Sequence, residues 1–117
     1  MENTPRHVGL DVHKESITIG VAGEGRGNAE VLATIPNELS VLLKHLKRLG
    51  LAESLRCCYE AGPTGYGLYR ELKTRGISCV VVAPSLVPVQ SGNRVKTDRR
   101  DAAKLAHFLR SGDLTAV

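Results

Sequence analysis

The spacing of apolar residues constrains the fold of this chain most strongly, because it changes from a strand pattern to a helix pattern partway along. His7–Val12 is a short apolar segment, and Ser16–Ala22 alternates apolar with small or polar residues, as a half-buried strand does. A turn over Val12–Glu15 separates them, and a glycine-rich segment precedes a third strand pattern at Ala29–Thr34. We expect these three strands to form an antiparallel meander.

Helical spacing begins after Pro36. Leucines recur at helical intervals from Leu39 to Leu49, Asn37 is a suitable N-cap, and Gly50 is a suitable end. Further helices are expected from the Ala61–Gly65 connection to about Arg75, over the short Pro84–Gln90 segment, and from Thr97 to about Arg110, with a loop at Ser91–Val95. The second half of the chain therefore alternates between strands and helices.

Two apolar runs between these helices predict further strands. Leu55–Tyr59 ends at Glu60, and Ile77–Ala83 is apolar enough to be buried on both faces, as central parallel strands are. Together with the meander, these runs predict an α/β domain with a five-stranded mixed sheet.

Length and composition place the chain among single-domain globular proteins. It has 117 residues, of which 42% are hydrophobic and 24% charged. No stretch approaches the roughly 20 apolar residues of a membrane helix, and the amino terminus lacks the apolar segment of a secretory signal. We therefore expect a cytoplasmic protein without membrane contact. The three cysteines, Cys57, Cys58 and Cys79, fall in apolar runs without metal or redox spacing, so we expect reduced core residues.

Four carboxylates stand at expected strand ends or helix starts: Asp11, Glu60, Asp98 and Asp101. An α/β sheet gathers the ends of its parallel strands at one edge, so these carboxylates are expected to meet there. Oxygen ligands suit Mg²⁺, or Mn²⁺, and two ions about 4 Å apart support phosphodiester chemistry. We interpret the four residues as catalytic metal ligands, and mutual repulsion should raise the pKa of at least one of them.

A simpler interpretation accompanies each of these carboxylates. Asp98 and Asp101 lie three residues apart at a helix start, where both would be favoured by the helix dipole as capping residues. Asp11 alone suits a turn, and Glu60 alone suits a solvated strand end. Independent caps have no reason to converge on one edge, which favours the metal-binding interpretation.

Basic residues surround the carboxylate pair near the carboxyl terminus. The segment from Asn93 to Arg110 holds six basic and two acidic residues. Its net charge, six minus two, is +4 and equals that of the whole chain. Candidate nucleic-acid-binding residues are Lys14, Arg94, Lys96, Arg99, Arg100 and Lys104. With only three Tyr and one Phe, contact with phosphate should exceed base stacking. The alternative is a solvated basic face.

Three motifs in these regions resemble a known family. Val8-Gly9-Leu10-Asp11-Val12-His13-Lys14, Tyr59-Glu60-Ala61-Gly62-Pro63-Thr64-Gly65 and Asn93-Arg94-Val95-Lys96-Thr97-Asp98-Arg99-Arg100-Asp101-Ala102 are similar to motifs of the amino-terminal domain of DEDD-type insertion-sequence transposases. The resemblance covers nearly the whole chain, and the motifs occur in the family's order.

The resemblance implies a RuvC-like ribonuclease H fold with Asp11, Glu60, Asp98 and Asp101 as the metal-binding tetrad. It also implies a DNA recombinase that assembles as a homo-oligomer at full length and that, in part of the family, is directed by a structured RNA. Family members carry a second, carboxy-terminal domain with a serine thought to attack DNA. On this basis residues 1–117 are expected to be a fragment that lacks the serine-bearing domain.

Two other classes of function remain open from the sequence. An actin-like or sugar-kinase-like ATP-binding lobe shares the opening strands and an aspartate on the first, but a glycine-rich turn should follow that aspartate, and Val12-His13-Lys14 follows instead. A non-catalytic RNA-binding or dimerisation module would use the acids as caps. Metal titration separates this last class from a nuclease domain.

Overall fold

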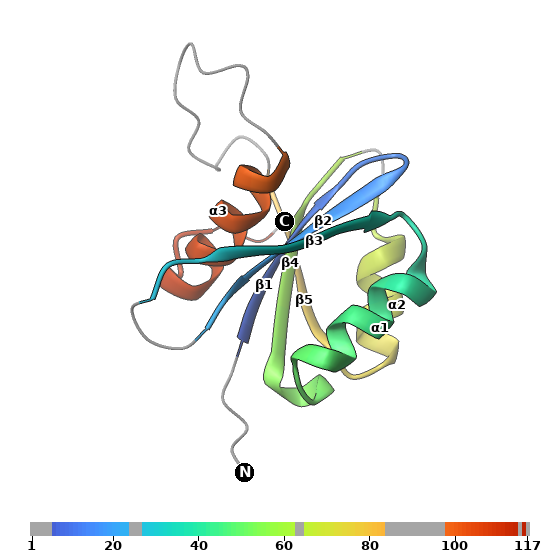
Figure 1. Cartoon of the computed structure of the whole chain (residues 1–117). Coiled ribbons are helices and arrows are strands. Elements are labelled where there is room, and N and C mark those ends of the chain that lie inside the picture. Colours follow the sequence, from blue (N-terminus) through green and yellow to red (C-terminus); the bar gives the residue numbers. More distant parts are fainter. Residues whose placement is uncertain (1–5, 24–26, 63–64, 84–97, 115, 117) are drawn as a thin grey trace.

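A five-stranded sheet flanked by three α-helices forms the domain (Figure 1). The computed structural model describes residues 6–23, 27–62, 65–83, 98–114 and 116, and for residues 98–101 it describes the backbone alone. The strands are β1 (Arg6–Val12), β2 (Ser16–Ala22), β3 (Glu30–Pro36), β4 (Leu55–Glu60) and β5 (Ser78–Val82). The helices are α1 (Leu39–Leu49), α2 (Gly67–Thr74) and α3 (Asp98–Ser111), with a short 3₁₀ helix at Ala52–Ser54. The expected α/β class is confirmed and is consistent with a ribonuclease H-like fold.

The strand order in the sheet is β3-β2-β1-β4-β5, with β1 at the centre. β1, β2 and β3 form the expected antiparallel meander, whereas β4 lies parallel to both β1 and β5. Leu10 of β1 therefore pairs with Ile19 of β2 on one side and with Tyr59 of β4 on the other. The two strands that carry Asp11 and Glu60 are neighbours, as the sequence predicted.

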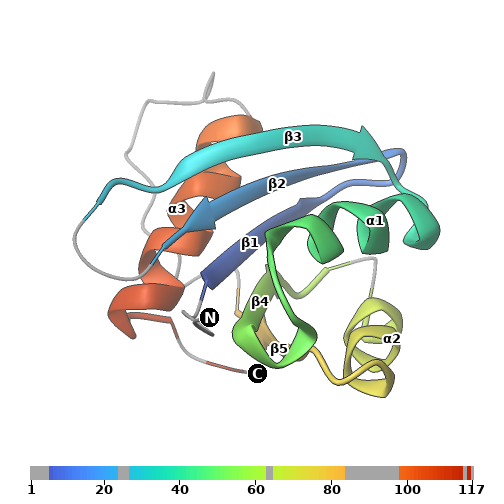
Figure 2. The same cartoon turned by 60° about the horizontal axis from the view of Figure 1, so that its bottom comes forward.

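Helices cover the two faces of the sheet unequally. Figures 1 and 2 show α1 and α2 on one face and α3 on the other. The main apolar core lies under α1 and α2, where Leu42, Leu46 and Leu72 pack on alternate residues of β1 such as Val8 and Leu10. Because successive side chains of a strand point to opposite faces, the residues that alternate with Val8 and Leu10, namely Gly9 and Asp11, belong to the face that α3 covers.

On this second face, two paired glycines let α3 approach the sheet at backbone distance. Gly9 of β1 and Gly20 of β2 are register partners. A Cβ atom added to Gly9 would lie 2.5 Å from the amide nitrogen of Ala106, and one added to Gly20 would lie 2.5 Å from the carbonyl carbon of Ala102. Any side chain at either position would push the helix away, so the close approach depends on glycine at both.

One hydrogen bond shows the direction in which α3 crosses the sheet. Near its last turn, Nη1 of Arg110 donates to the carbonyl oxygen of Gly23, at 3.0 Å. Gly23 follows Ala22, which pairs with His7 near the start of β1. The end of α3 therefore lies near the start of β1, and its beginning is directed toward the end of β1, as Figure 1 also shows.

The helix cap predicted at Asn37 was wrong. The N-cap of α1 is Glu38, whose side chain makes no capping hydrogen bond. Asn37 Nδ2 instead donates to the carbonyl oxygen of His13 at 2.7 Å, because the pairing of Ser16 with Pro36 brings the end of β3 beside the β1–β2 turn. The predicted end of α1 is confirmed, since Gly50 follows it with a φ of 154°.

Other boundaries differ by a few residues. β3 continues to Pro36 rather than Thr34 because its pairing with β2 persists to Ser16, and the 3₁₀ helix was not predicted. The helix expected at Pro84–Gln90 and the loop at Ser91–Val95 lie outside the described residues. The cysteine prediction is confirmed, as all three thiols are free and buried. Among the described residues, none of the helices combines the length and apolar character needed to cross a membrane.

Candidate metal and nucleic-acid site

The first two candidate ligands occupy neighbouring positions at the ends of parallel strands. Asp11 and Glu60 each follow one member of the register pair Leu10–Tyr59. Leu10 and Tyr59 both pack into the core under α1 and α2, so Asp11 and Glu60 share the opposite face, that of α3. Both side chains are partly buried, and that of Asp11 is only 14% exposed. The structure thus brings together two of the four predicted carboxylates.

Two polar neighbours border Asp11. Across the sheet its register partner is Thr18, which is buried and whose hydroxyl hydrogen-bonds to that of Thr34 at 3.0 Å. From the turn beyond β1, Nε2 of His13 donates to Oδ2 of Asp11 at 3.1 Å. A carboxylate this far from bulk solvent needs such partners, because unpaired burial of its charge is costly.

A buried tyrosine organises the chain that leaves Glu60. Tyr59 is fully buried, and its hydroxyl donates to the carbonyl oxygen of Gly65 at 2.7 Å and accepts from the amide of Tyr69 at 3.1 Å. Burial is also the main reason why its pKa is raised. The amide of Ala61 donates to Val82 of β5 at 2.8 Å. These bonds tie the segment after Glu60 to α2 and to the sheet edge.

The other two candidate ligands belong to the first turn of α3, where the structure describes the backbone. Their side chains lie outside the described part of the chain. The residue after Asp101 is Ala102, whose carbonyl group contacts the positions of Gly9 and Gly20, and Gly9 precedes Asp11 by two residues. The backbone therefore places the start of α3 on the face and toward the strand ends where Asp11 and Glu60 lie. Convergence of all four carboxylates stays a prediction.

A metal centre is not complete within the described side chains. Among them, no group of three or more His, Cys, Asp or Glu residues is arranged to hold an ion. That statement does not cover two of the four predicted ligands, Asp98 and Asp101, because their side chains are not among those described.

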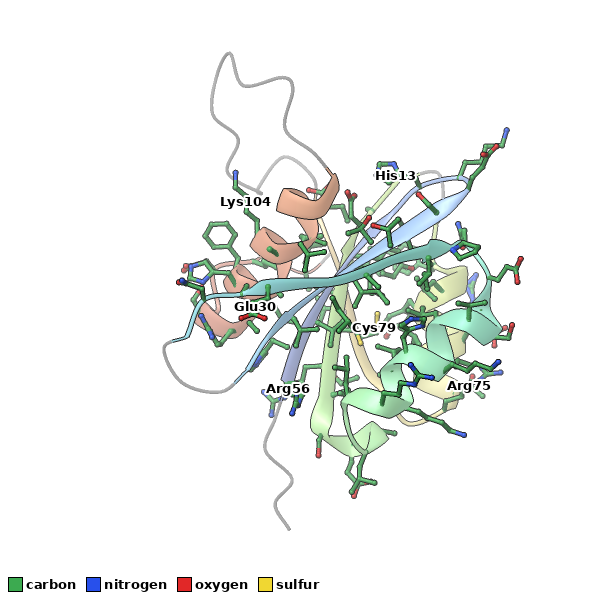
Figure 3. The ribbon with its side chains drawn as sticks, viewed as in Figure 1. His13, Glu30, Arg56, Arg75, Cys79 and Lys104 are labelled. Carbon is green, nitrogen blue, oxygen red and sulfur yellow. The ribbon has the colours of Figure 1, made fainter. Side chains whose placement is uncertain are left out.

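The candidate nucleic-acid contacts are described in part. Lys14 is exposed in the β1–β2 turn, and Lys104 is partly exposed on α3 (Figure 3). Arg94 and Lys96 lie outside the described residues, and of Arg99 and Arg100 the backbone in the first turn of α3 is described. The basic residues that can be placed thus flank the same end of the sheet as the carboxylates, and their contact with phosphate stays a prediction.

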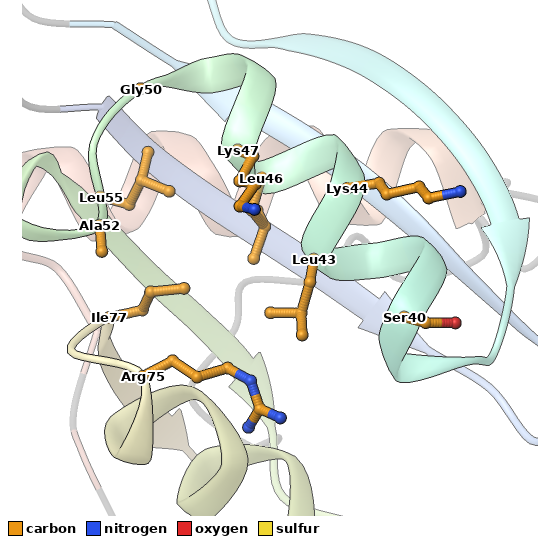
Figure 4. Close-up of a pocket in the computed structure, with 10 residues that line it drawn as sticks. All are labelled: Ser40, Leu43, Lys44, Leu46, Lys47, Gly50, Ala52, Leu55, Arg75 and Ile77. Atoms are coloured by element: carbon orange, nitrogen blue, oxygen red, sulfur yellow. The ribbon is translucent and has the colours of Figure 1, made fainter.

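An open pocket of about 470 Å³ lies away from the carboxylates (Figure 4). Its floor is apolar, including Leu46, Leu55 and Ile77, and Lys47 and Arg75 stand at its rim. Leu55 is the first residue of β4, whereas Glu60 is the last, so the pocket lies toward the opposite end of the strands. None of the described carboxylates lines it, and it plays no part in the candidate site.

Sequence reasoning missed the contributions of His13, Tyr59 and the two facing glycines. His13 lacks a paired ligand spacing, and the only signal for its role was its position two residues beyond Asp11, which allows both side chains to leave the strand end together. Tyr59 was treated as part of an apolar run. Gly9 and Gly20 gave no periodic pattern, because their importance depends on a cross-strand register that becomes visible only in the sheet.

Comparison with known proteins identifies the family. Residues 8–117 match the family model of IS110-type DEDD transposases. The chain is 47% identical over 112 residues to the protein named "Putative transposase y4qE" of Sinorhizobium fredii, covering 94% of this chain and 29% of that protein. It is 42% identical over 106 residues to the transposase for insertion sequence element IS1533 of Leptospira borgpetersenii, covering 90% and 31%. It thus spans about three tenths of these relatives, and it belongs to the IS110-type DEDD transposase family.

Proposed function

We propose that this chain is the metal-binding catalytic domain of a DNA transposase that acts on phosphodiester bonds. Asp11, Glu60, Asp98 and Asp101 are the proposed ligands of Mg²⁺, or Mn²⁺. The observation that carries the proposal is the adjacency of Asp11 and Glu60 on parallel strands, on the face that α3 covers. Membership of a family named for its DEDD carboxylates supports the same assignment.

The donor set fits a hard divalent cation. Asp11 and Glu60 offer oxygen ligands from rigid strand ends, and magnesium prefers a few carboxylates while it keeps several waters. When bound, such ions neutralise charge on a phosphate and activate the attacking oxygen. The part played by the chain itself is to hold the carboxylates: β1 and β4 fix two of them through the sheet, and α3 carries the other two on a helix packed against Gly9 and Gly20.

The proposed substrate is nucleic acid, bound mainly through its phosphates. Lys14, Arg94, Lys96, Arg99, Arg100 and Lys104 are the proposed contacts. Positive side chains beside a cluster of carboxylates would balance the repulsion between those carboxylates and an incoming phosphate. By family resemblance we extend the proposal to a structured guide RNA as second partner and to a homo-oligomer of the full-length protein.

Calorimetric titration with Mn²⁺ and with Mg²⁺ tests the metal site. We expect the wild-type chain to bind, and Asp11→Asn, Glu60→Gln, Asp98→Asn and Asp101→Asn each to bind more weakly, since each substitution removes a charged ligand but keeps its size. Glu53→Gln, in the 3₁₀ helix far from the strand ends, is the matched control. Equal binding by the wild type and the four variants would show that the carboxylates are caps or turn residues.

The alternative of an ATP-binding lobe has no support from the geometry. The turn after Asp11 contains no glycine and is closed by a hydrogen bond from the amide of His13 to the carbonyl oxygen of Ser16, at 2.8 Å. The backbone amide of His13 is therefore hydrogen-bonded within the hairpin and is not directed at a phosphate. A non-catalytic module remains the competing function, and the titration above decides between the two.

A further inference from the structure

We propose that His13 is a positioning residue for Asp11, and that Asn37 holds His13 where it can do so. This inference rests on the proposed function of Asp11 as a metal ligand and adds two residues to that site. It begins from the contact between Nε2 of His13 and Oδ2 of Asp11, at 3.1 Å. Figure 3 shows His13 at the end of the sheet toward which the start of α3 is directed.

The two side chains differ in their freedom. His13 is 45% exposed, whereas Asp11 is 14% exposed. An exposed histidine on a flexible turn would add little, because holding a mobile side chain in one geometry offsets most of the gain from the contact. The contact can orient Asp11 only if the backbone of His13 is itself fixed.

Asn37 provides this fixed point. Its Nδ2 donates to the carbonyl oxygen of His13 at 2.7 Å and lies 3.4 Å from that of Lys14. Its backbone amide donates to the carbonyl oxygen of Glu15 at 3.1 Å. One residue at the β3–α1 junction therefore binds three successive carbonyl groups of the β1–β2 turn, which explains why an asparagine stands here without capping α1.

The chemical consequence concerns the two oxygens of Asp11. A hydrogen bond to Oδ2 fixes the rotation of the carboxylate, so that Oδ1 is presented in one direction. Partners that orient a metal ligand in this way change metal affinity about 10- to 100-fold when they are removed. Asn37, His13 and Asp11 would then act in sequence, and the loss of either supporting residue would weaken the same contact to Oδ2 of Asp11.

The test is Mn²⁺ titration of the 117-residue chain by calorimetry, together with urea unfolding in the absence of metal. We expect His13→Ala to weaken Mn²⁺ binding about 10-fold. His13→Gln should restore much of the loss, because the glutamine amide nitrogen extends about as far from the backbone as histidine Nε2. Asn37→Ala should weaken binding as well, and the double variant no more than His13→Ala alone, since both act through one contact.

His107→Ala is the matched control, because it removes an exposed histidine from the later part of α3, where the ring contacts Arg110. The inference is overturned if Asp11→Asn loses binding while His13→Ala binds as the wild type does, or binds more tightly because the histidine had blocked Oδ2. It is also overturned if each loss of affinity matches a loss of folding stability, which would show a structural role. Failure of the wild-type chain to bind Mn²⁺ would overturn the metal site itself.

Discussion

Substituting alanine for Gly9 or Gly20 tests the most demanding packing contact in this domain. The new Cβ at Gly9 would stand 2.5 Å from the Ala106 amide nitrogen and 2.6 Å from Leu105 Cβ, and closer still to the Ala102 carbonyl oxygen. Favourable contacts lie at about 3.5–4.0 Å, so α3 would have to retreat by about 1 Å. Its neighbours are mostly helix backbone, which has no other rotamer to adopt.

The magnitude follows from two opposing effects. Overpacking of this kind costs about 1–3 kcal/mol, and the upper part of that range applies where backbone must move. Replacing glycine by alanine in a strand recovers about 0.5–1 kcal/mol of chain entropy. We therefore expect Gly9→Ala and Gly20→Ala each to lower the free energy of unfolding by about 2 kcal/mol.

Urea unfolding followed by circular dichroism measures this difference. Gly67→Ala is the matched control, because Gly67 opens α2 and an added Cβ there meets nothing within 4 Å. Its stability should equal or slightly exceed that of the wild type. If Gly9→Ala and Gly20→Ala both stay within about 0.5 kcal/mol of this control, α3 yields easily and the close approach is not a constraint.

Three further predictions concern the nucleic-acid contacts, the loop after β4 and the buried thiols. Arg99→Ala and Arg100→Ala should each weaken DNA binding and reduce the slope of log affinity against log salt by about one, as measured by fluorescence anisotropy across a salt series. Tyr59→Phe should lower the free energy of unfolding by about 1–2 kcal/mol, because two partly buried backbone groups lose their hydroxyl partner. Burial raises the pKa of all three cysteines, that of Cys79 to about 12 from an ordinary value of 9.0. Stability should therefore fall as pH rises from 9 toward 12, where the unfolded chain loses thiol protons that the folded chain keeps, and urea unfolding at several pH values measures the fall.

Each of these predictions has its own control. Arg75→Ala, on the far side of the sheet from α3, should leave the slope of log affinity against log salt unchanged. If the Arg99 and Arg100 variants also keep the wild-type slope, their charges face solvent and do not contact phosphate. Tyr66→Phe removes an exposed hydroxyl and should be neutral, so an equal stability of the Tyr59 variant would contradict the role of its hydroxyl. Cys79→Ala should flatten the alkaline loss of stability, and an unchanged slope would assign that loss to other groups.

The fold was largely predictable because its strands and helices carry strong periodic patterns. The bounds of β2 and the end of α1 were predicted correctly. The apolar run at β5 predicted a parallel strand, which is confirmed, but the central position expected for it was wrong, because β5 is the last strand in the order of the described sheet and its Ser78 is exposed. Adjacent placement of β1 and β4 followed from the same patterns and is confirmed. Local sequence determines these features, so a single chain suffices to infer them.

The misses share a different cause, which is that they depend on contacts between distant segments. Asn37 has the chemistry of a helix cap, and only the register of β2 with β3 brings it to the carbonyl oxygen of His13 instead. The requirement for glycine at position 9 likewise depends on its register partner Gly20 and on the packing of α3, which follows much later in the chain. For the candidate site, the sequence predicted which carboxylates lie on neighbouring strands, but not the tyrosine and histidine that hold the chain around them.

The contact of β1 with α3 also bears on when the domain becomes complete during synthesis. These are the first and the last of the regular elements described, so the pair has a very large sequence separation. The amino-terminal meander leaves the ribosome well before α3, and contacts between residues so far apart in sequence form late in folding. A nascent chain would thus hold Asp11 and Glu60 in place while the two ligands proposed for α3 are still to be made. Under the proposed function, the metal site would then be complete only in chains whose translation has passed this helix.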